Sequence, residues 1–419
     1  MISLDLAHKY LKTIHPPLPV RTTLDKALNQ VCAEDVYAAA NCPSVDSSLK
    51  DGFAVVSADT VDATQNNPVT LTVIGVLSAG NDSDNFRVTS GTAVRIMTGA
   101  PIPSGATAVL ASEFSKVKGE LVTITADALE GRNILRKGRD IVLGQEVLRK
   151  GTLLGAAHLG LLAAAGLNEV PCYPLPKVAV VATGSELVWP GDPVLPGKVA
   201  ASNMVIAAAE LQTLGINGST VILHDSLDHL QEQFKRIVEE VDILITCGGV
   251  LDGDKDLTMK AMEQIGMEKI FHRVRIGPGK GACMGRVGET VVFNLPGGPP
   301  SNHVALQLLA LPGVRRLMGC ENYLPRKDTV QVAGELSGQE NWTQLVYSRV
   351  QSENGLLTAV PLSGVGRLEA MAIGNGLIEI PEGCLGIKDG AQANAWLYNT
   401  IYSFNLLFGV EDQSLLDGV

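Results

Sequence analysis

The sequence has few aromatic residues and no concentrated basic segment. Aromatic residues make up 4% of its 419 residues, and the formal net charge is −11. Proteins that bind single-stranded nucleic acid stack bases on aromatic side chains, and nucleic-acid binders in general place lysine and arginine against the phosphates. The composition therefore argues against a general nucleic-acid-binding protein. An anionic ligand would need locally placed cations or backbone N–H groups.

Long apolar runs and paired cysteines are also missing. Without a run of about 18 apolar residues, we expect no transmembrane helix and no membrane partner. The first 20 residues have an amphipathic pattern with mixed charges, which is unlike a signal peptide. None of the seven cysteines lies in a CxxC pair, which argues against a zinc site or a disulfide framework. A soluble cytoplasmic protein with mostly reduced thiols is the simplest interpretation.

The chain is long enough for several domains, and 46% of its residues are hydrophobic. Helical spacing predicts helix, loop and helix over residues 1–40, with the second helix beginning near Thr23 or Asp25. Short strands dominate residues 69–125 and 328–405, and a proline-rich linker is expected over 171–176. The expected domains are an N-terminal/linker domain (1–44 and 131–176), an inserted β-rich domain (45–130), a central α/β domain (177–325) and a C-terminal small β-barrel (326–419).

One stretch in the central domain places acidic residues directly after a predicted buried strand. Residues 241–246 form a short apolar run, which ends in Gly248 and Gly249. Three acidic residues follow, namely Asp252, Asp254 and Asp256. Taken alone, this loop fits an ordinary turn with solvated charges as well as it fits a ligand site.

Two other loops repeat the pattern of strand, glycine turn and polar group. The run 177–182 ends in the loop 183–186, and the run 290–295 ends in the loop 296–301. Helix-like segments at 203–214 and 227–240 lie between the strands, which predicts βαβ units on a parallel sheet. Ligands bind such sheets at the carboxyl ends of the strands. Free backbone N–H groups there suit phosphate, and carboxylates beside phosphate suit a divalent metal.

The motifs, in order, are DGFA, RIMTGAPIP, GRNILRKGRDI, VATGSEL, ASN, CGGV-DGDKD, GPGK and NLPGGPPS. This series closely resembles the molybdopterin molybdenumtransferase family, called MoeA in bacteria and forming the E domain of gephyrin in animals. The resemblance covers roughly residues 5–400. It implies a multidomain α/β and β fold, with a central parallel molybdopterin-binding domain and an N-terminal helical segment.

The resemblance also implies an activity. The expected reaction takes adenylylated molybdopterin and molybdate or tungstate, releases AMP with the help of Mg²⁺, and completes molybdenum cofactor biosynthesis. The implied assembly is a homodimer, whose active site lies between the α/β domain of one subunit and the β-rich domain of the other. The adenylyltransferase of the pathway is a further implied partner.

Matching the family's motifs residue by residue gives the expected site. The positions implied to be catalytic are Asp51, Thr98, Asp140 and Lys280. The positions implied to bind molybdopterin are Thr183, Gly184, Gly248, Gly249, Pro296, Gly297, Ser301 and Arg349. The positions implied to hold Mg²⁺ are Glu186 and Asp256, whose carboxylate oxygens suit a hard cation.

Several positions depart from the family pattern. Gly277 stands where the family has a lysine, which removes a charged hydrogen bond worth roughly 1.5–3 kcal/mol. The other departures are Gly281, Gly298, Ser185 and Arg367. Arg275 or Arg367 would be able to replace the missing charge, or either could be an ordinary surface residue. Two hypotheses follow: an active or retuned insertion enzyme, and an impaired paralogue that binds molybdopterin or a protein partner without inserting metal.

Overall fold

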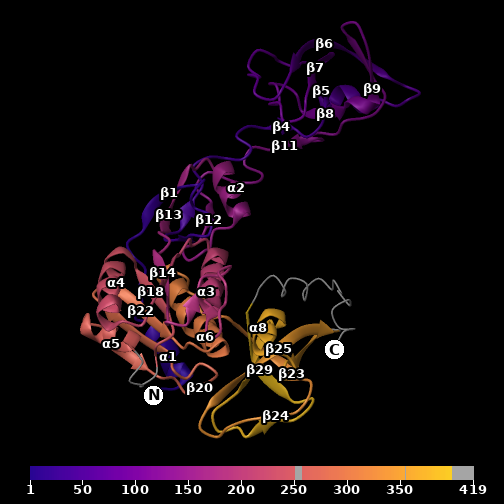
Figure 1. The fold of residues 1–419 in the computed structure, drawn as a ribbon. Helices are drawn as coiled ribbons and strands as arrows, with labels where there is room; N and C mark the ends of the chain where they lie inside the picture. The colour runs from indigo at the N-terminus through magenta and orange to yellow at the C-terminus, as the bar shows by residue number, and fades with distance from the viewer. Residues whose placement is uncertain (251–256, 354, 399–419) are drawn as a thin grey trace. The chain divides into compact units, whose positions relative to one another are not determined.

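The computed structural model describes residues 1–250, 257–353 and 355–398 (Figure 1). The chain divides into two compact units. Unit 1 consists of Met1–Val20, Asn29–Val31 and Tyr173–Val419, and unit 2 consists of Arg21–Leu28 and Cys32–Cys172. The fold is the multidomain α/β and β architecture that the sequence predicts.

A six-stranded sheet forms the centre of unit 1. Across the sheet the strands are β17 (Ser219–Leu223), β14 (Val178–Thr183), β18 (Ile243–Cys247), β22 (Thr290–Leu295), β21 (Cys283–Val287) and β19 (Glu268–His272). The first four are parallel to one another, whereas β21 and β19 are antiparallel to their neighbours. The parallel sheet predicted from the three apolar runs is therefore confirmed.

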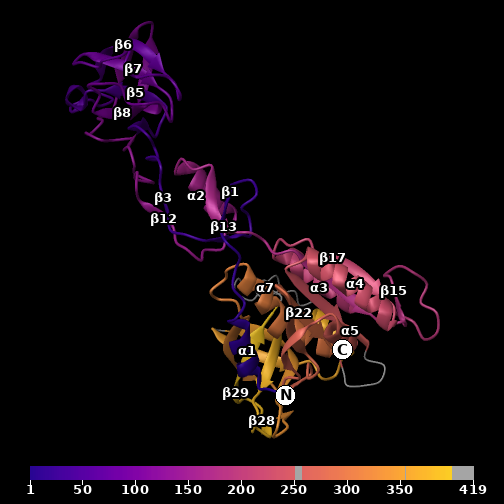
Figure 2. The same ribbon diagram turned by 90° about the vertical axis from the view of Figure 1, so that its left-hand side faces the viewer.

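Every residue of β14, β18 and β22 is buried, because helices cover both faces of the sheet. Alternate side chains enter two different cores, with Val180 on one face and Val181 on the other. The helices are α1 (Leu4–Leu11), α3 (Ser202–Thr213), α6 (Pro299–Ala305) and α7 (Leu311–Leu317) on the first face, and α4 (Leu227–Glu240) and α5 (Leu257–Gln264) on the second (Figures 1 and 2). A π-helical turn, η3 (Leu306–Ala310), joins α6 to α7.

The C-terminal strands form the small closed barrel that the sequence predicts. The barrel strands, in order, are β25 (Thr343–Glu353), β26 (Leu356–Pro361), β23 (Arg326–Val332), β29 (Gln392–Leu397) and β27 (Gly376–Ile380). Closure comes from the pairing of β27 back onto β25. A short strand, β20 (Ile276–Gly277), pairs with β25. Two further short strands, β24 (Leu336–Ser337) and β28 (Gly386–Ile387), pair with each other, and one helix, α8 (Arg367–Ile373), completes this region.

Unit 2 carries a six-stranded sheet of its own. Its strands, in order, are β8 (Ala108–Ala111), β5 (Gly52–Val55), β7 (Thr92–Ile96), β6 (Val69–Leu77), β10 (Leu121–Ile124) and β9 (Ser115–Lys118). Two short 3₁₀ turns flank them, η1 (Ser57–Thr60) and η2 (Ser112–Phe114). The strands β4 (Ser47–Ser48) and β11 (Ile134–Leu135) pair where the chain enters and leaves this region.

The second helix expected within residues 1–40 is wrong. This segment instead contains β1 (Val20–Thr23), β2 (Val31–Cys32) and β3 (Val36–Tyr37). β1 and β2 flank β13 (Glu169–Tyr173), so pairing with a distant strand overrides the local apolar spacing. β13 also replaces the first part of the linker expected at 171–176. The remaining elements are β12 (Glu146–Leu148), which pairs with β3, the helix α2 (Ala156–Ala164), and the pair β15 (Leu187–Val188) and β16 (Val199–Ala200).

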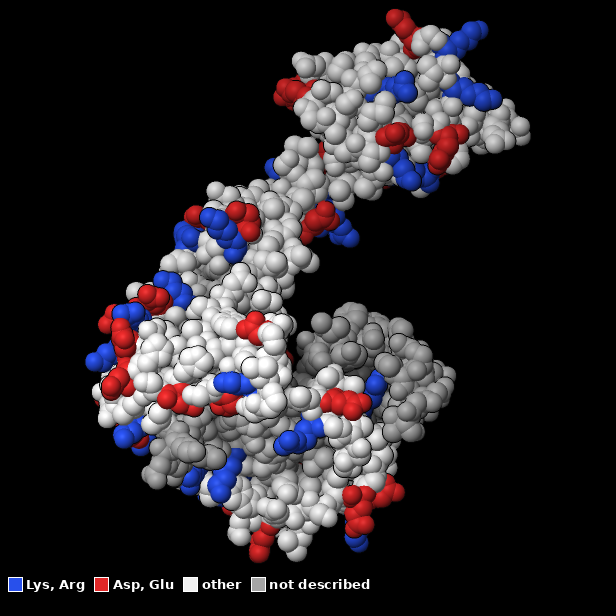
Figure 3. All heavy atoms as spheres, viewed as in Figure 1, with Lys and Arg blue, Asp and Glu red and all other residues white. Residues whose placement is uncertain are grey.

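The surface in Figure 3 mixes both signs of charge. Lysine and arginine side chains alternate with aspartate and glutamate, and neither unit shows a broad basic area on this face. Within the described ranges, no helix is both long and apolar enough to cross a membrane.

Candidate active site

Three loops meet where the central parallel strands end. Ala182, Cys247 and Leu295 are paired across β14, β18 and β22, so the residues that follow them emerge side by side at one edge of the sheet. Two of the three loops are described in full, and the third is described up to Val250. Its acidic part, which contains Asp252, Asp254 and Asp256, lies outside the described residues.

The two glycines after β18 are required by their surroundings. Gly248 has φ +115°, and its N–H donates to the Leu295 carbonyl at 2.9 Å. A Cβ on Gly248 would lie 2.7 Å from the Thr183 carbonyl oxygen. Gly249 has φ +65°, and a Cβ there would lie 2.3 Å from the Thr258 hydroxyl, which donates to the Thr183 hydroxyl at 2.9 Å. Only glycine lets the backbone pass this close to the paired threonines.

Two asparagines hold the loop after β22. The buried Asn302 side chain donates to the Pro296 carbonyl at 2.9 Å. Asn203, at the start of α3, donates to the Gly297 carbonyl at 2.9 Å. Gly297 and Gly298 are exposed, and Ser301 is half-buried in the first turn of α6. The loop is therefore fixed through its carbonyl oxygens while its glycines face solvent.

The loop after β14 is hydrogen-bonded to a carboxylate of another loop, which we did not expect from the sequence. Asp225 follows β17, and its carboxylate accepts from the Ser185 N–H at 3.0 Å. In return the Asp225 N–H donates to the Ser185 hydroxyl at 3.2 Å. Ser185 thus connects two strand ends. A glycine signal was absent after β17, but a short apolar run followed by His224-Asp225 was visible.

Glu186 is exposed at the same loop. Its carboxylate lies against Gly184, where a Cβ would come within 2.6 Å of both carboxylate oxygens. Among the described residues, no group of three histidine, cysteine, aspartate or glutamate side chains is arranged to hold a metal. Glu186 and Asp225 nevertheless offer oxygen donors on adjoining loops, which is the donor type that Mg²⁺ prefers.

The residues around Gly277 lie beside the barrel. Gly277 pairs with Gln344 of β25, and among the described residues no heavy atom beyond its chain neighbours lies within 4 Å of the position its Cβ would take. The exposed Lys280 lies over the Trp342 ring, with its ammonium nitrogen 4.7 Å from the ring centre. Arg275 forms an ion pair with Glu382 at 3.0 Å, so its charge already has a partner.

The barrel contacts the loop after β22, residues 296–301 (the PGGPPS loop), through Tyr347. The Tyr347 hydroxyl donates to the Pro300 carbonyl at 3.3 Å and lies 3.0 Å from Nδ1 of His303. Burial lowers the pKa of His303 to about 4. Arg349 is half-buried two residues further along β25, on the same face of the strand as Tyr347. Arg367 is exposed at the beginning of α8.

The other expected catalytic residues belong to unit 2. The Asp51 carboxylate accepts from both the N–H and the hydroxyl of Thr98, each at 2.7 Å. Both hydrogen bonds lower the pKa of Asp51, and the one from the Thr98 N–H contributes more than the one from its hydroxyl. Asp51 and Thr98 are thus brought together. Asp140 is exposed, and its N–H donates to the Cys42 carbonyl at 3.0 Å.

Comparison with known families accounts for nearly the whole chain. Residues 2–166 match the MoeA N-terminal region (domain I and II), residues 179–316 match a probable molybdopterin binding domain, and residues 329–398 match the MoeA C-terminal region (domain IV). A solved structure, the molybdopterin biosynthesis MoeA protein from Pyrococcus horikosii, is 30% identical with a TM-score of 0.77. The alignment covers 95% of this chain and 99% of that one.

Named relatives agree with this match. Molybdopterin molybdenumtransferase 2 of Mycobacterium tuberculosis is 34% identical over 387 residues, covering 90% of this chain and 95% of the relative. Molybdopterin molybdenumtransferase of Staphylococcus aureus is 32% identical over 374 residues, covering 88% and 89%. The fold and its strand-end loops define a multidomain protein of the molybdopterin-binding α/β class. More specifically, the chain belongs to the MoeA family of molybdopterin molybdenumtransferases, and the resemblance seen in the motifs is confirmed.

Proposed function

We propose that this protein inserts molybdenum into adenylylated molybdopterin and releases AMP, which completes molybdenum cofactor biosynthesis. The observation that carries the proposal is the close passage of Gly248 and Gly249 over the paired Thr183 and Thr258 hydroxyls. Backbone without side chains at the ends of parallel strands can approach a phosphate closely. A cytoplasmic location is part of the same proposal.

We assign the binding of molybdopterin and its phosphates to the three loops and to one barrel residue. The assigned residues are Thr183, Gly184, Gly248, Gly249, Pro296, Gly297, Ser301 and Arg349. Support comes from the shared edge of β14, β18 and β22, and from the two asparagines that hold the PGGPPS loop by its carbonyl oxygens while Gly297 stays exposed. Lys280 is assigned to the oxyanion, because its ammonium group is exposed next to the barrel.

We assign Mg²⁺ to Glu186 and Asp256, and we add Asp225 to this pair. Asp225 and Glu186 lie on loops joined through Ser185, and both side chains are exposed. When bound, Mg²⁺ supplies positive charge that offsets the charge developing on the departing AMP. Asp225 also orients the loop by accepting from the Ser185 N–H.

We propose that Asp51, Thr98 and Asp140 act on the substrate held by a second subunit. They belong to unit 2, whereas the strand-end loops belong to unit 1. The doubly hydrogen-bonded Asp51 carboxylate stays ionised, which suits an electrostatic or metal-binding role. A homodimer is therefore expected at micromolar concentration in sedimentation experiments, and a monomer there contradicts the shared site.

A second candidate function is an impaired paralogue that binds molybdopterin without inserting metal. The observation that favours it is the open surroundings of Gly277 and Gly298: apart from chain neighbours, no heavy atom of the described part of the chain lies within 4 Å of the position that a Cβ would take. Arg275 is paired with Glu382, and so it does not supply a free charge in place of the missing lysine.

Complementation separates the two candidates. A bacterial strain that lacks its own insertion enzyme would carry this gene, and molybdoenzyme activity would be measured. The proposed activity predicts restored molybdoenzyme activity with the wild-type protein and loss of it with Lys280→Gln. If soluble wild-type protein accumulates and carries molybdopterin but restores no activity, the second candidate is correct and the insertion proposal is overturned.

A further inference from the structure

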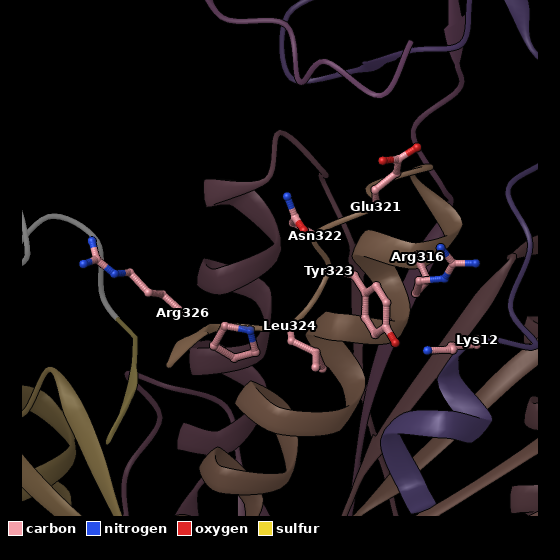
Figure 4. Close-up of a pocket in the computed structure, with 8 residues that line it drawn as sticks. Lys12, Arg316, Glu321, Asn322, Tyr323, Leu324 and Arg326 are labelled. Carbon is pink, nitrogen blue, oxygen red and sulfur yellow. The ribbon is translucent and has the colours of Figure 1, made fainter. Parts of the chain in front are cut away.

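A hollow of about 690 Å³ lies on unit 1, away from the candidate active site (Figure 4). It is formed by the end of α1, the end of α7 and the segment that leads into the barrel. α6 begins beside the PGGPPS loop, and α6, η3 and α7 form one continuous helical stretch from Pro299 to Leu317. That stretch is roughly 27 Å long at 1.5 Å per residue, so the hollow lies near the opposite edge of the sheet.

The lining of this hollow is basic in a chain that is acidic overall. Lys12, Arg316 and Arg326 face it together with a single carboxylate, Glu321, although the formal net charge of the chain is −11. Arg326 is paired with Asp328 at 2.6 Å. Lys12 is exposed and has no ion-pair partner within the part of the chain that the structure describes. In Figure 4 the Glu321 carboxylate points away from the space between Lys12 and Tyr323.

Arg316 is held rigidly and has unused hydrogen-bonding capacity. Its guanidinium carbon lies 5.2 Å from the centre of the Tyr323 ring, and Nη2 donates to the Ile14 carbonyl at 3.2 Å. Its Nε–H is buried and has no acceptor among the described residues. A fixed guanidinium loses little freedom when it binds an anion, which favours binding.

Helix dipoles explain only part of this arrangement. Lys12 is the C-cap of α1, and Arg316 lies in the last turn of α7, where cations are favoured. A cation that only offsets a dipole can point into solvent. Here the Lys12 ammonium group points towards the Tyr323 hydroxyl, and Arg316 lies beside the same ring (Figure 4). Two cations therefore lie beside the Tyr323 ring at one side of the hollow.

We propose that this hollow binds the phosphoryl group of a small phosphorylated molecule, at a site separate from the candidate active site. Lys12 supplies a compact charge, Arg316 a planar donor group, and Asn322 a neutral donor, whereas the Tyr323 hydroxyl donates to the His8 carbonyl at 3.5 Å. A phosphoryl group has three oxygens to accept from such a set, whereas a carboxylate has two. Leu324 and Pro325 provide an apolar wall for the rest of the molecule, and the volume is typical of small-ligand pockets.

The test titrates inorganic pyrophosphate against the full-length protein by calorimetry. Lys12→Gln removes one charged contact from an exposed residue, so the expected loss in affinity is about tenfold at this site. Lys9→Gln is the matched control, because Lys9 is an exposed residue of the same helix that does not line the hollow. The control should bind as the wild type does. Equal weakening in both variants would mean a general charge effect and would overturn the proposal.

Two further arms distinguish this site from others. Lys280→Gln changes the candidate active site, so binding that is lost in Lys280→Gln and kept in Lys12→Gln would belong there and contradict a separate site. Citrate tests the ligand class, because carboxylate binding as tight as pyrophosphate binding would refute the phosphoryl assignment.

Discussion

His303 should make the protein less stable in mildly acidic solution. The side chain is 5% exposed, and its Nδ1 lies 3.0 Å from the Tyr347 hydroxyl. Because that hydroxyl donates to the Pro300 carbonyl, we infer that it accepts from Nδ1–H. Burial disfavours the charged form, so the ring is neutral near pH 7. The other ring nitrogen faces Gln307, which donates to Glu210 at 2.7 Å. No carboxylate among the described residues is therefore bonded directly to the ring.

The sign and size of the effect follow from the pKa values of the two states. Burial lowers the pKa of His303 to about 4 in the folded protein, against about 6.5 in the unfolded chain. Between these values the unfolded chain binds a proton that the folded protein does not, so stability falls as the pH falls. The loss should be about 2 kcal/mol between about pH 7.5 and pH 5, and about 3 kcal/mol in total below pH 4.

Neighbouring groups make a difference measurement necessary. Burial raises the pKa of Glu210 in the folded protein. As the pH falls, the folded protein therefore takes up a proton at Glu210 before the unfolded chain does, which stabilises the folded state and opposes the effect of His303. Burial also lowers the pKa of His8, which acts in the same direction as His303. Both groups remain in a His303→Asn variant, so subtraction isolates His303.

Urea unfolding followed by circular dichroism over this pH range is the assay. His303→Asn should be less stable than the wild type near neutral pH. Its free energy of unfolding should then decrease by about 2 kcal/mol less than that of the wild type on going to about pH 5. The exposed His15→Asn variant is the control and should keep the wild-type slope. Parallel curves for His303→Asn and the wild type would refute the assignment of a buried, neutral imidazole.

Three further variants test the candidate active site. Gly249→Ala should lose about 1–3 kcal/mol of stability, because φ is +65° and its Cβ would lie 2.3 Å from a threonine hydroxyl. Gly364→Ala is the control and should change the denaturation curve little, because no atom of the described residues, chain neighbours apart, lies within 4 Å of its Cβ position. Glu186→Gln should require more Mg²⁺ for AMP release while changing stability by less than about 0.5 kcal/mol, and an unchanged Mg²⁺ dependence contradicts its metal role. Gly277→Lys combined with Gly298→Asn should raise molybdate affinity about tenfold in calorimetry, whereas equal affinities would remove both positions from the oxyanion site.

The sheets and the barrel could be predicted because their signals are local. The apolar runs that became β14, β18 and β22 are short, β-branched and followed by glycine turns, so their alternation with helical segments indicates parallel strands. The helix predicted near Thr23 was wrong because the structure of this segment depends on a distant part of the chain. β2 is stabilised by pairing with β13, which lies about 140 residues further along the chain. The local spacing of apolar residues does not reveal this pairing.

The candidate site could be predicted only in part. Glycines mark the loops that follow β14, β18 and β22, but Asp225 follows β17 without a glycine and was therefore missed. The contact of Tyr347 with Pro300 depends on how the barrel packs against α6, which no local pattern encodes. Likewise, the sequence alone leaves Arg275 available as a replacement charge, whereas the structure pairs it with Glu382.

Molybdate-dependent AMP release tests the central claim most directly. Purified protein would be incubated with adenylylated molybdopterin and Mg²⁺, with and without molybdate, and AMP and reconstituted molybdoenzyme activity would be measured together. The proposed function predicts that molybdate accelerates AMP release and that one active cofactor forms for each AMP released. Tight binding of adenylylated molybdopterin without AMP release or cofactor formation would contradict it and identify the protein as an impaired, molybdopterin-binding member of the family.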